Sequence, residues 1–232
     1  MAQSEIWERE YRHPQLLTRK PEPQTDLKDF LRFLRKHEEV ALEGLRVLDL
    51  GSGTGRNGNY IAKLGNSTVG LEISETAVAL ARQRAAEMGV AAEYRLASFG
   101  ETYPFADESF DVAIDVTSSN SLNEKEREIY VSETRRVLKK GGYLFVKALC
   151  KDGDKNAKNL LKLHPGPEAD TYINPDLGLT ERVFTRQDFI DKYGKSFKIL
   201  RLQSKANYTR FNGQPYKRHF WLAYLRKEEI DE

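Results

Sequence analysis

The sequence predicts an α/β fold built on one doubly wound sheet with helices on both faces. Two observations lead to this class. Short apolar segments suited to buried strands alternate along the chain with segments of helical periodicity. A turn with three glycines, Gly51 to Gly55, also separates the first apolar segment from the helix that follows it. Strands that alternate with helices form mainly parallel sheets, because each helix returns the chain to the start of the next strand.

Length and composition favour one domain. The chain has 232 residues, of which 31% are charged and 39% hydrophobic, and this balance is typical of a globular protein with a single core. We therefore expect one domain over residues 1–232. Its successive parts are expected to be an N-terminal arm and helix, a ligand-binding core, a substrate-covering segment, and a C-terminal helix with strands, at residues 1–44, 45–149, 150–183 and 184–232.

Several classes of protein and site are disfavoured. No apolar run approaches the length of a membrane span, and the first residues lack the layout of a secretory signal, so we expect a cytoplasmic protein with no membrane partner. The single cysteine, Cys150, permits no internal disulfide and is expected in the core. Four dispersed histidines give no metal-ligand spacing, so no metal site is predicted.

The N-terminal part is expected to be an arm followed by a helix. Residues 1–24 predict an irregular or briefly helical arm, in which Trp7 and Tyr11 either anchor the arm or close over a ligand. Thr25 or Asp26 is expected to cap a helix that continues to about His37, with apolar side chains at helical spacing.

The glycine turn is the strongest local signal. Val47 to Leu50 is an apolar run suited to a buried strand, and residues 56–64 are suited to a helix. Glycines between them tolerate positive φ and let the backbone approach a ligand, while the free N–H groups of the helix face the turn. Asp49 could accept hydrogen bonds from the turn or from a cationic ligand. This arrangement predicts a site for a polar small molecule.

Two families fit the turn. Gly53-x-Gly55-x-x-Gly58 satisfies the dinucleotide fingerprint, although the strand ends better at Gly51, and a nicotinamide-dependent oxidoreductase is one alternative. Asp49-Leu-Gly-Ser-Gly-Thr-Gly55 resembles the first motif of class I S-adenosylmethionine-dependent methyltransferases.

The second strand is expected at residues 68–72 and ends in an acid. Glu72 lies about twenty residues beyond the turn, where a carboxylate at a strand end can accept both hydroxyl hydrogens of a ribose. Ser74 resembles the N-cap of the helix that follows, with Ala77 at its third position.

A third strand at residues 92–96 precedes a segment, 103–115, that is similar to the turn before the fourth strand of many class I methyltransferases. The family often places an acid after the third strand to bond the adenine amino group, and the nearest counterpart here is Ser98. Its hydroxyl can accept the same bond. Ala97 and Phe99 are expected to give backbone contact and an apolar wall.

Polar residues from Asp115 onward follow the fourth strand, and the carboxyl ends of parallel strands line the ligand crevice. A helix at 124–138, a Lys-Lys-Gly-Gly stop and a fifth strand at 143–149 also resemble this family. The resemblance thus covers most of residues 45–149. It implies S-adenosylmethionine as cofactor, bound by residues at the ends of the first four strands: Asp49, Gly51, Ser52, Gly53, Gly55, Glu72, Ile73, Ser98, Phe99 and Asp115.

The rest of the chain is less typical. Residues 151–183 form a long connection with a short helix expected at 159–163, and such a connection is usually functional or disordered. A helix is expected at 188–193, and strands at 199–203 and 219–226. The resemblance implies a mostly parallel, seven-stranded sheet whose last strand runs antiparallel.

The activity implied is methyl transfer, and a small-molecule acceptor is favoured because the chain is little more than a catalytic core. An RNA or protein methyltransferase and a non-catalytic cofactor-binding module are the alternatives. RNA is suggested by basic and aromatic residues near the C-terminus: Lys205, Arg210, Lys217 and Arg218 with Tyr208, Phe211, Tyr216, Phe220 and Trp221. Equally, Phe220 and Trp221 suit the core of the last strand. No catalytic residue is assigned, and a monomer or homodimer is expected.

Overall fold

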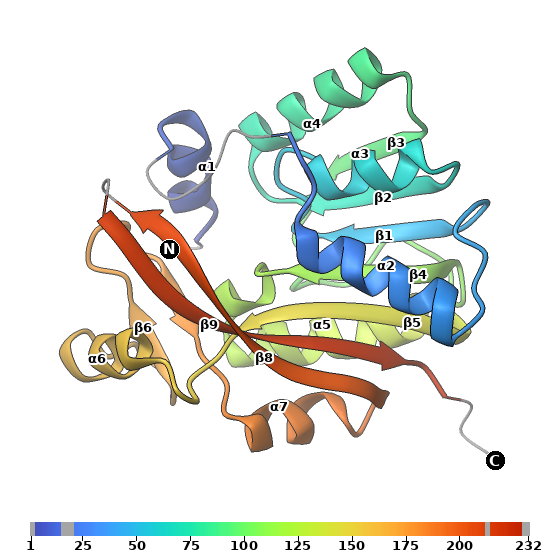
Figure 1. Ribbon diagram of the computed structural model, residues 1–232. Coiled ribbons are helices and arrows are strands. Elements are labelled where there is room, and N and C mark those ends of the chain that lie inside the picture. Colours follow the sequence, from blue (N-terminus) through green and yellow to red (C-terminus); the bar gives the residue numbers. More distant parts are fainter. Residues whose placement is uncertain (1–2, 15–20, 212–213, 229–232) are drawn as a thin grey trace.

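The computed structural model describes residues 3–14, 21–211 and 214–228. Its main sheet has seven strands in the order β3-β2-β1-β4-β5-β9-β8 (Figure 1). Along the chain these are β1 (Arg46–Leu50), β2 (Ser67–Glu72), β3 (Ala92–Leu96), β4 (Phe110–Val116), β5 (Leu138–Leu149), β8 (Lys198–Phe211) and β9 (Gln214–Arg226). The first five strands are parallel, and β9 runs antiparallel to both β5 and β8. The predicted mostly parallel sheet with an antiparallel last strand is confirmed.

Helices cover both faces of the sheet, with α2 in front of it and α5 behind it in Figure 1. On one face α2 (Thr25–His37) and α3 (Arg56–Lys63) pack on Val47, Val112 and Phe145. On the other face α5 (Glu124–Val137) and α7 (Arg186–Tyr193) pack on Leu48, Leu50 and Leu144. Alternate residues of β1 therefore enter different layers, as the period of a strand requires. A smaller cluster joins α4 (Glu75–Met88) to Tyr94 of β3.

The strand order fixes where a ligand can lie. The chain moves outward from β1 through β2 to β3, then returns to place β4 on the other side of β1. In open α/β sheets the crevice forms at this reversal, outside the carboxyl ends of the strands. The turns after β1 and β4 flank that point.

The structure is more regular than predicted outside residues 45–149. The arm contains a full helix, α1 (Ser4–Arg12). The covering segment contains α6 (Lys155–Leu163), which starts earlier than expected because the Asp154 side chain caps it by accepting a hydrogen bond from Ala157 N. It also contains an unpredicted two-stranded sheet of β6 (Thr171–Ile173) and β7 (Thr180–Arg182).

The last two strands are much longer than predicted and form one extended hairpin. A short helical turn, η1 (Ser119–Ser121), follows β4. Cys150 is buried. In the described part of the chain, every helix is too short or too polar to cross a bilayer. The division into one domain with four parts stays a prediction.

Candidate functional site

The turn after β1 has the backbone that its glycines allow. Gly51, Gly53 and Gly55 have φ values of +67°, +54° and +75°, in the left-handed region. There is also little space for a side chain in this turn. A Cβ on Gly51 would lie 2.4 Å from the Cβ of Ser118, and a Cβ on Gly53 would lie 2.6 Å from the Tyr11 hydroxyl oxygen. The turn is therefore enclosed by the loop after β4 and by α1.

Glu72 holds the turn from the end of β2. Its Oε2 accepts a hydrogen bond from Gly53 N at 2.8 Å, and its Oε1 accepts from Ile73 N at 2.8 Å and Ser74 N at 3.0 Å. Burial raises the pKa of this carboxyl group, although the three backbone N–H groups oppose the shift. Oε1 accepts two of these bonds and Oε2 accepts one, so Oε2 retains a lone pair, and Glu72 lines the main cavity. Glu72 is thus both a support of the turn and an acceptor for a ligand hydroxyl.

Asp49 supports the same turn from below. Its Oδ2 accepts a hydrogen bond from Gly58 N at 3.1 Å. Gly55 is the N-cap of α3 and has no side chain to cap the helix, so Asp49 satisfies a free N–H group of the first turn in its place. Burial raises the pKa of Asp49 to about 7, and the Glu72 and Asp115 carboxylates add to the rise.

Asp115, at the end of β4, supports the loop after that strand, as Glu72 supports the glycine turn. Its Oδ1 accepts hydrogen bonds from Ser118 N at 3.0 Å and Ser119 N at 3.2 Å, and its Oδ2 accepts from the Tyr130 hydroxyl at 3.1 Å. The Ser118 hydroxyl in turn donates to Gly51 O at 3.1 Å. Asp115 is fully buried and orders the loop that closes on the glycine turn.

These elements surround a cavity of about 1480 Å³ at the carboxyl edge of the sheet. Seven of the ten sequence-predicted cofactor residues line it: Gly51, Ser52, Gly53, Glu72, Ile73, Ser98 and Phe99. The other three, Asp49, Gly55 and Asp115, lie behind its wall and shape the two loops. Contact of each of the ten with the cofactor stays a prediction.

The cavity has the features that an adenosyl ligand needs. Tyr11 lies close to Gly53, so the side chain of any larger residue at position 53 would fill the space between them. Glu72 offers Oε2 to a hydroxyl of the ligand, and Phe99 offers an apolar face. Ser52 Oγ is buried with no hydrogen-bond partner among the described residues, so it can bond to a ligand. These residues fit S-adenosylmethionine.

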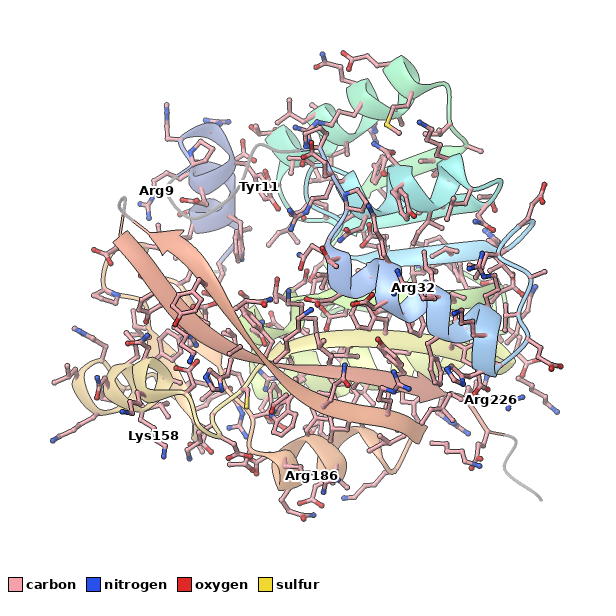
Figure 2. The ribbon with its side chains drawn as sticks, in the orientation of Figure 1. Arg9, Tyr11, Arg32, Lys158, Arg186 and Arg226 are labelled. Atoms are coloured by element: carbon pink, nitrogen blue, oxygen red, sulfur yellow. The ribbon has the colours of Figure 1, made fainter. Side chains whose placement is uncertain are left out.

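Helix α1 lies along the cavity, in the arm that the sequence predicts only as irregular or briefly helical. Gln3, Trp7 and Tyr11 line the cavity, and Figure 2 labels Tyr11 on α1. At one end of α1, the Gln3 side chain exchanges hydrogen bonds with the Thr180 backbone, at 2.9 and 2.6 Å. At the middle of α1, Glu8 accepts hydrogen bonds from Thr76 and Ser74. The interpretation of Trp7 and Tyr11 as residues that close over the site agrees with this placement.

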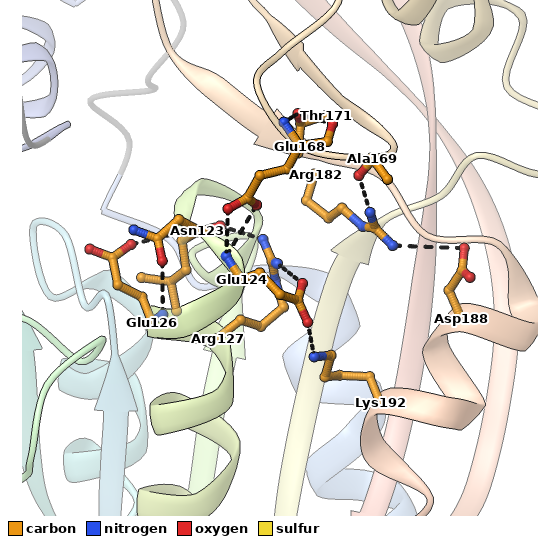
Figure 3. Close-up of polar contacts among 11 residues, drawn as sticks. Asn123, Glu124, Glu126, Arg127, Glu168, Ala169, Thr171, Arg182, Asp188 and Lys192 are labelled. Carbon is orange, nitrogen blue, oxygen red and sulfur yellow. Dashed lines mark hydrogen bonds and ion pairs between the residues drawn. The ribbon is translucent and has the colours of Figure 1, made fainter.

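The covering segment is fastened to the N-terminus of α5 (Figure 3). Both Glu168 oxygens accept a hydrogen bond from Glu124 N, at 3.0 and 3.1 Å. Glu124 forms ion pairs with Arg127 and Lys192, and Arg182 approaches Asp188 at 4.0 Å. Glu168 also lines the cavity, so this contact connects the roof of the site to the core.

Two of the four basic C-terminal residues form ion pairs within the fold. Lys205 pairs with Asp26, and Arg218 pairs with Asp154 at 3.0 Å. Phe220 and Trp221 are buried, which confirms their interpretation as residues of the last strand's core. The side chains of Arg210 and Phe211 lie outside the described residues. In the described ranges, no group of three or more His, Cys, Asp or Glu side chains could hold a metal ion.

Comparison with known proteins shows which family the domain around this cavity resembles. Residues 47–142 match the family model of a methyltransferase domain, from β1 to the start of β5. Residues 47–142 thus form a methyltransferase domain, and the fold around them is that of a solved S-adenosylmethionine-dependent methyltransferase. S-adenosylmethionine is the methyl donor of this class.

Curated relatives of this methyltransferase domain are biosynthetic enzymes. The ubiquinone biosynthesis O-methyltransferase of Chelativorans sp. (strain BNC1) is 35% identical over 104 residues, which make up 45% of this chain and 40% of that protein. The enzyme of the same name from Rhizobium etli is 32% identical over 105 residues, covering 45% of this chain and 41% of that one. The chain therefore spans about two-fifths of the length of these relatives.

Solved methyltransferases share the fold over most of the chain. A methyltransferase from Methanosarcina mazei superposes with a TM-score of 0.73 at 24% identity, covering 84% of this chain and 97% of that one. The 1,6-didemethyltoxoflavin-N1-methyltransferase of Burkholderia thailandensis, solved with its acceptor and S-adenosylhomocysteine, gives a TM-score of 0.64 at 16% identity, covering 88% and 79%.

Proposed function

We propose that this chain transfers a methyl group from S-adenosylmethionine to a small-molecule acceptor. The observation that carries the proposal is the roofed cavity. It runs from the glycine turn past the ends of β4 and β5 to Leu160, Glu168 and Thr180 of the covering segment. A compact acceptor can be enclosed there, whereas a macromolecule needs an open surface.

The residues of the chain divide the work of binding and orientation. When bound, S-adenosylmethionine supplies an electrophilic methyl group on a sulfonium centre. Glu72 binds a ribose hydroxyl and the glycine turn admits the ligand backbone closely. Ser98 and Phe99 contact the adenine. Helix α1 and the covering segment exclude water, so alignment and desolvation supply much of the rate. No residue is assigned as a general base.

The comparisons support a small acceptor. Enzymes named for ubiquinone biosynthesis and for toxoflavin methylation are related to this chain in sequence or in fold. An RNA acceptor is less well supported, since Lys205 and Arg218 already form ion pairs with Asp26 and Asp154. A protein acceptor would have to enter beneath the roof.

The test is a methyl-transfer screen with labelled S-adenosylmethionine against small-molecule pools and cellular RNA. We expect label in a small-molecule fraction, and loss of that label in the Glu72→Ala variant. Label in RNA alone would contradict the proposal that the acceptor is a small molecule. Binding of S-adenosylmethionine without turnover on any pool would favour the non-catalytic module, and calorimetric binding of NAD in its place would favour the oxidoreductase.

A further inference from the structure

A buried lysine lies at the acceptor end of the cavity. Lys147, on β5, is only 6% exposed and lines the main cavity. Its Nζ donates hydrogen bonds to Gln24 Oε1 and Asp26 Oδ2, both at 2.7 Å. The same Nζ lies 4.6 Å from the centroid of the Phe220 ring. An ammonium group has three N–H donors, so one donor is left for a ligand.

Two further cations surround this lysine. Lys205 Nζ contacts the second oxygen of Asp26 at 2.5 Å. Among the described residues, the Arg56 guanidinium forms no hydrogen bond or ion pair, and the Asp49 carboxyl group acts on it only through longer-range electrostatics. A side pocket of about 400 Å³ is lined by Lys147, Lys205 and Arg56. The acidic residues of this pocket are Asp26 and Glu22, and Glu22 is exposed. Asp26 thus pairs with two lysines. Arg56 adds a third positive charge to the pocket, and it does not contact Asp26.

A purely structural ion pair does not require this excess. Elsewhere on the same hairpin, Arg218 pairs with the buried Asp154 and Arg226 approaches Glu38, each with one carboxylate for one cation. Placing additional cations beside a buried pair raises the cost of desolvation and adds repulsion. Burial does lower the pKa of Lys147 and of Arg56. An anion in the pocket would remove this imbalance.

The side pocket opens toward the acceptor part of the main cavity. The two share Gln24, Arg56 and Lys147. Phe220 lies directly opposite Leu149 on β5 and Lys205 on β8, so its ring and these side chains are on one face of the sheet. A flat ligand placed against Phe220 therefore meets the cations at its edge.

We infer that Arg56, Lys147 and Lys205 bind an anionic group of the methyl acceptor, and that this acceptor is a planar carboxylic acid. The inference rests on the proposed function and specifies its substrate class. Lys147 donates its third N–H to the carboxylate, Arg56 donates from the side of the glycine turn, and Phe220 contacts the flat body of the molecule.

The test uses the full chain saturated with S-adenosylhomocysteine, titrated in a calorimeter with benzoate and with the uncharged, isosteric benzamide. We expect benzoate to bind at least about tenfold more tightly than benzamide. Lys147→Met should weaken benzoate by about tenfold or more and leave benzamide and S-adenosylhomocysteine unchanged. Arg226→Met is the matched control, because Arg226 lies on the same hairpin outside both cavities, and it should change neither ligand.

Three results would overturn the inference. They are equal affinity for the two probes, no benzoate binding at about 10 mM, and a Lys147→Met variant that loses S-adenosylhomocysteine instead. The last result would assign the cations to the carboxylate of the cofactor. If Lys147→Met does not fold, Arg56→Met and the comparison of probes on the unaltered chain still decide. Failure of the proposed function is read separately, as absence of label in every methyl-transfer pool.

Discussion

Glu8 of α1 and Thr76 of α4 are joined by two hydrogen bonds. The Thr76 hydroxyl donates to Glu8 Oε1 at 2.6 Å, and Thr76 N donates to Oε2 at 3.2 Å. The Ser74 hydroxyl adds a third bond to Oε2 at 2.6 Å. Burial raises the pKa of Glu8, but these hydrogen bonds outweigh it and bring the pKa to about 2. This contact fastens the helix that covers the cofactor loop.

Glu8→Gln should release α1. An amide presents only one acceptor oxygen to four donors, of which the fourth is Arg12 Nε at 2.8 Å from Oε1, so we expect a loss of about 1–3 kcal/mol in the free energy of unfolding near pH 7. Because the folded pKa is depressed, the contribution in the unaltered protein is present above pH 4.5 and is lost as the pH falls toward 2. Denaturant titrations across this range measure it. Glu5→Gln, an exposed change on the same helix, should have no such effect, and equal behaviour of both variants would contradict the role of Glu8.

Gly53→Ala should weaken the binding of S-adenosylmethionine. The left-handed backbone costs about 1 kcal/mol for alanine, and the new Cβ would lie 2.6 Å from the Tyr11 hydroxyl oxygen. Gly44 is the matched control, since its φ is +76° and a Cβ there meets nothing within 4 Å. Gly44→Ala should lower stability alone, whereas Gly53→Ala should also reduce affinity by about tenfold in calorimetry. Unchanged affinity in Gly53→Ala would separate the turn from the cofactor site.

Much of the core could be predicted from the sequence because its signals are local. The apolar run from Val47 to Leu50 forms a strand between two others, so its hydrophobicity reports its burial directly. Ser74 accepts the hydrogen bond from Ala77 N that its spacing predicted. Glu72, the acid at the end of β2, lines the cavity because the carboxyl ends of parallel strands meet at one edge of the sheet.

The remaining features depend on contacts between distant parts of the chain. Asp26 and Lys205 meet across 179 positions, and neither carries a local signal for the other. The excess length of β8 comes from pairing with β9, which overrides a polar sequence of low strand propensity. Asp49 and Asp115 accept hydrogen bonds from the backbone N–H groups of Gly58 and Ser118, a role that spacing alone does not predict. Their contact with the cofactor stays a prediction.

Glu168→Gln should loosen the covering segment. Its carboxylate accepts from Glu124 N through both oxygens, and an amide can maintain only one of those contacts. We expect faster limited proteolysis within residues 151–183, and protection by S-adenosylhomocysteine if the segment closes over the site. Asp176→Asn is the control, because Asp176 is exposed in the same segment. Equal resistance with and without ligand, in both variants, would identify a fixed insertion and contradict the predicted mobile cover.

Asp49→Asn should change how stability depends on pH. The carboxyl group has a pKa of about 7 in the folded protein and 3.8 as its ordinary value. Below about pH 4 both states are protonated, and Asp49 has no effect. Between these values the folded protein holds a proton that the unfolded chain has released, so stability falls as the pH rises, by about 4 kcal/mol in all at 1.36 kcal/mol per unit. Asparagine does not titrate and its oxygen can still accept from Gly58 N.

The variant should therefore match the unaltered protein near pH 4 and be the more stable one at pH 8, by up to about 4 kcal/mol. Urea unfolding at the two pH values measures the difference, and parallel curves would show that Asp49 is ionised in the folded protein throughout. Glu72 and Asp115 also have raised pKa values, so the variant retains part of the slope.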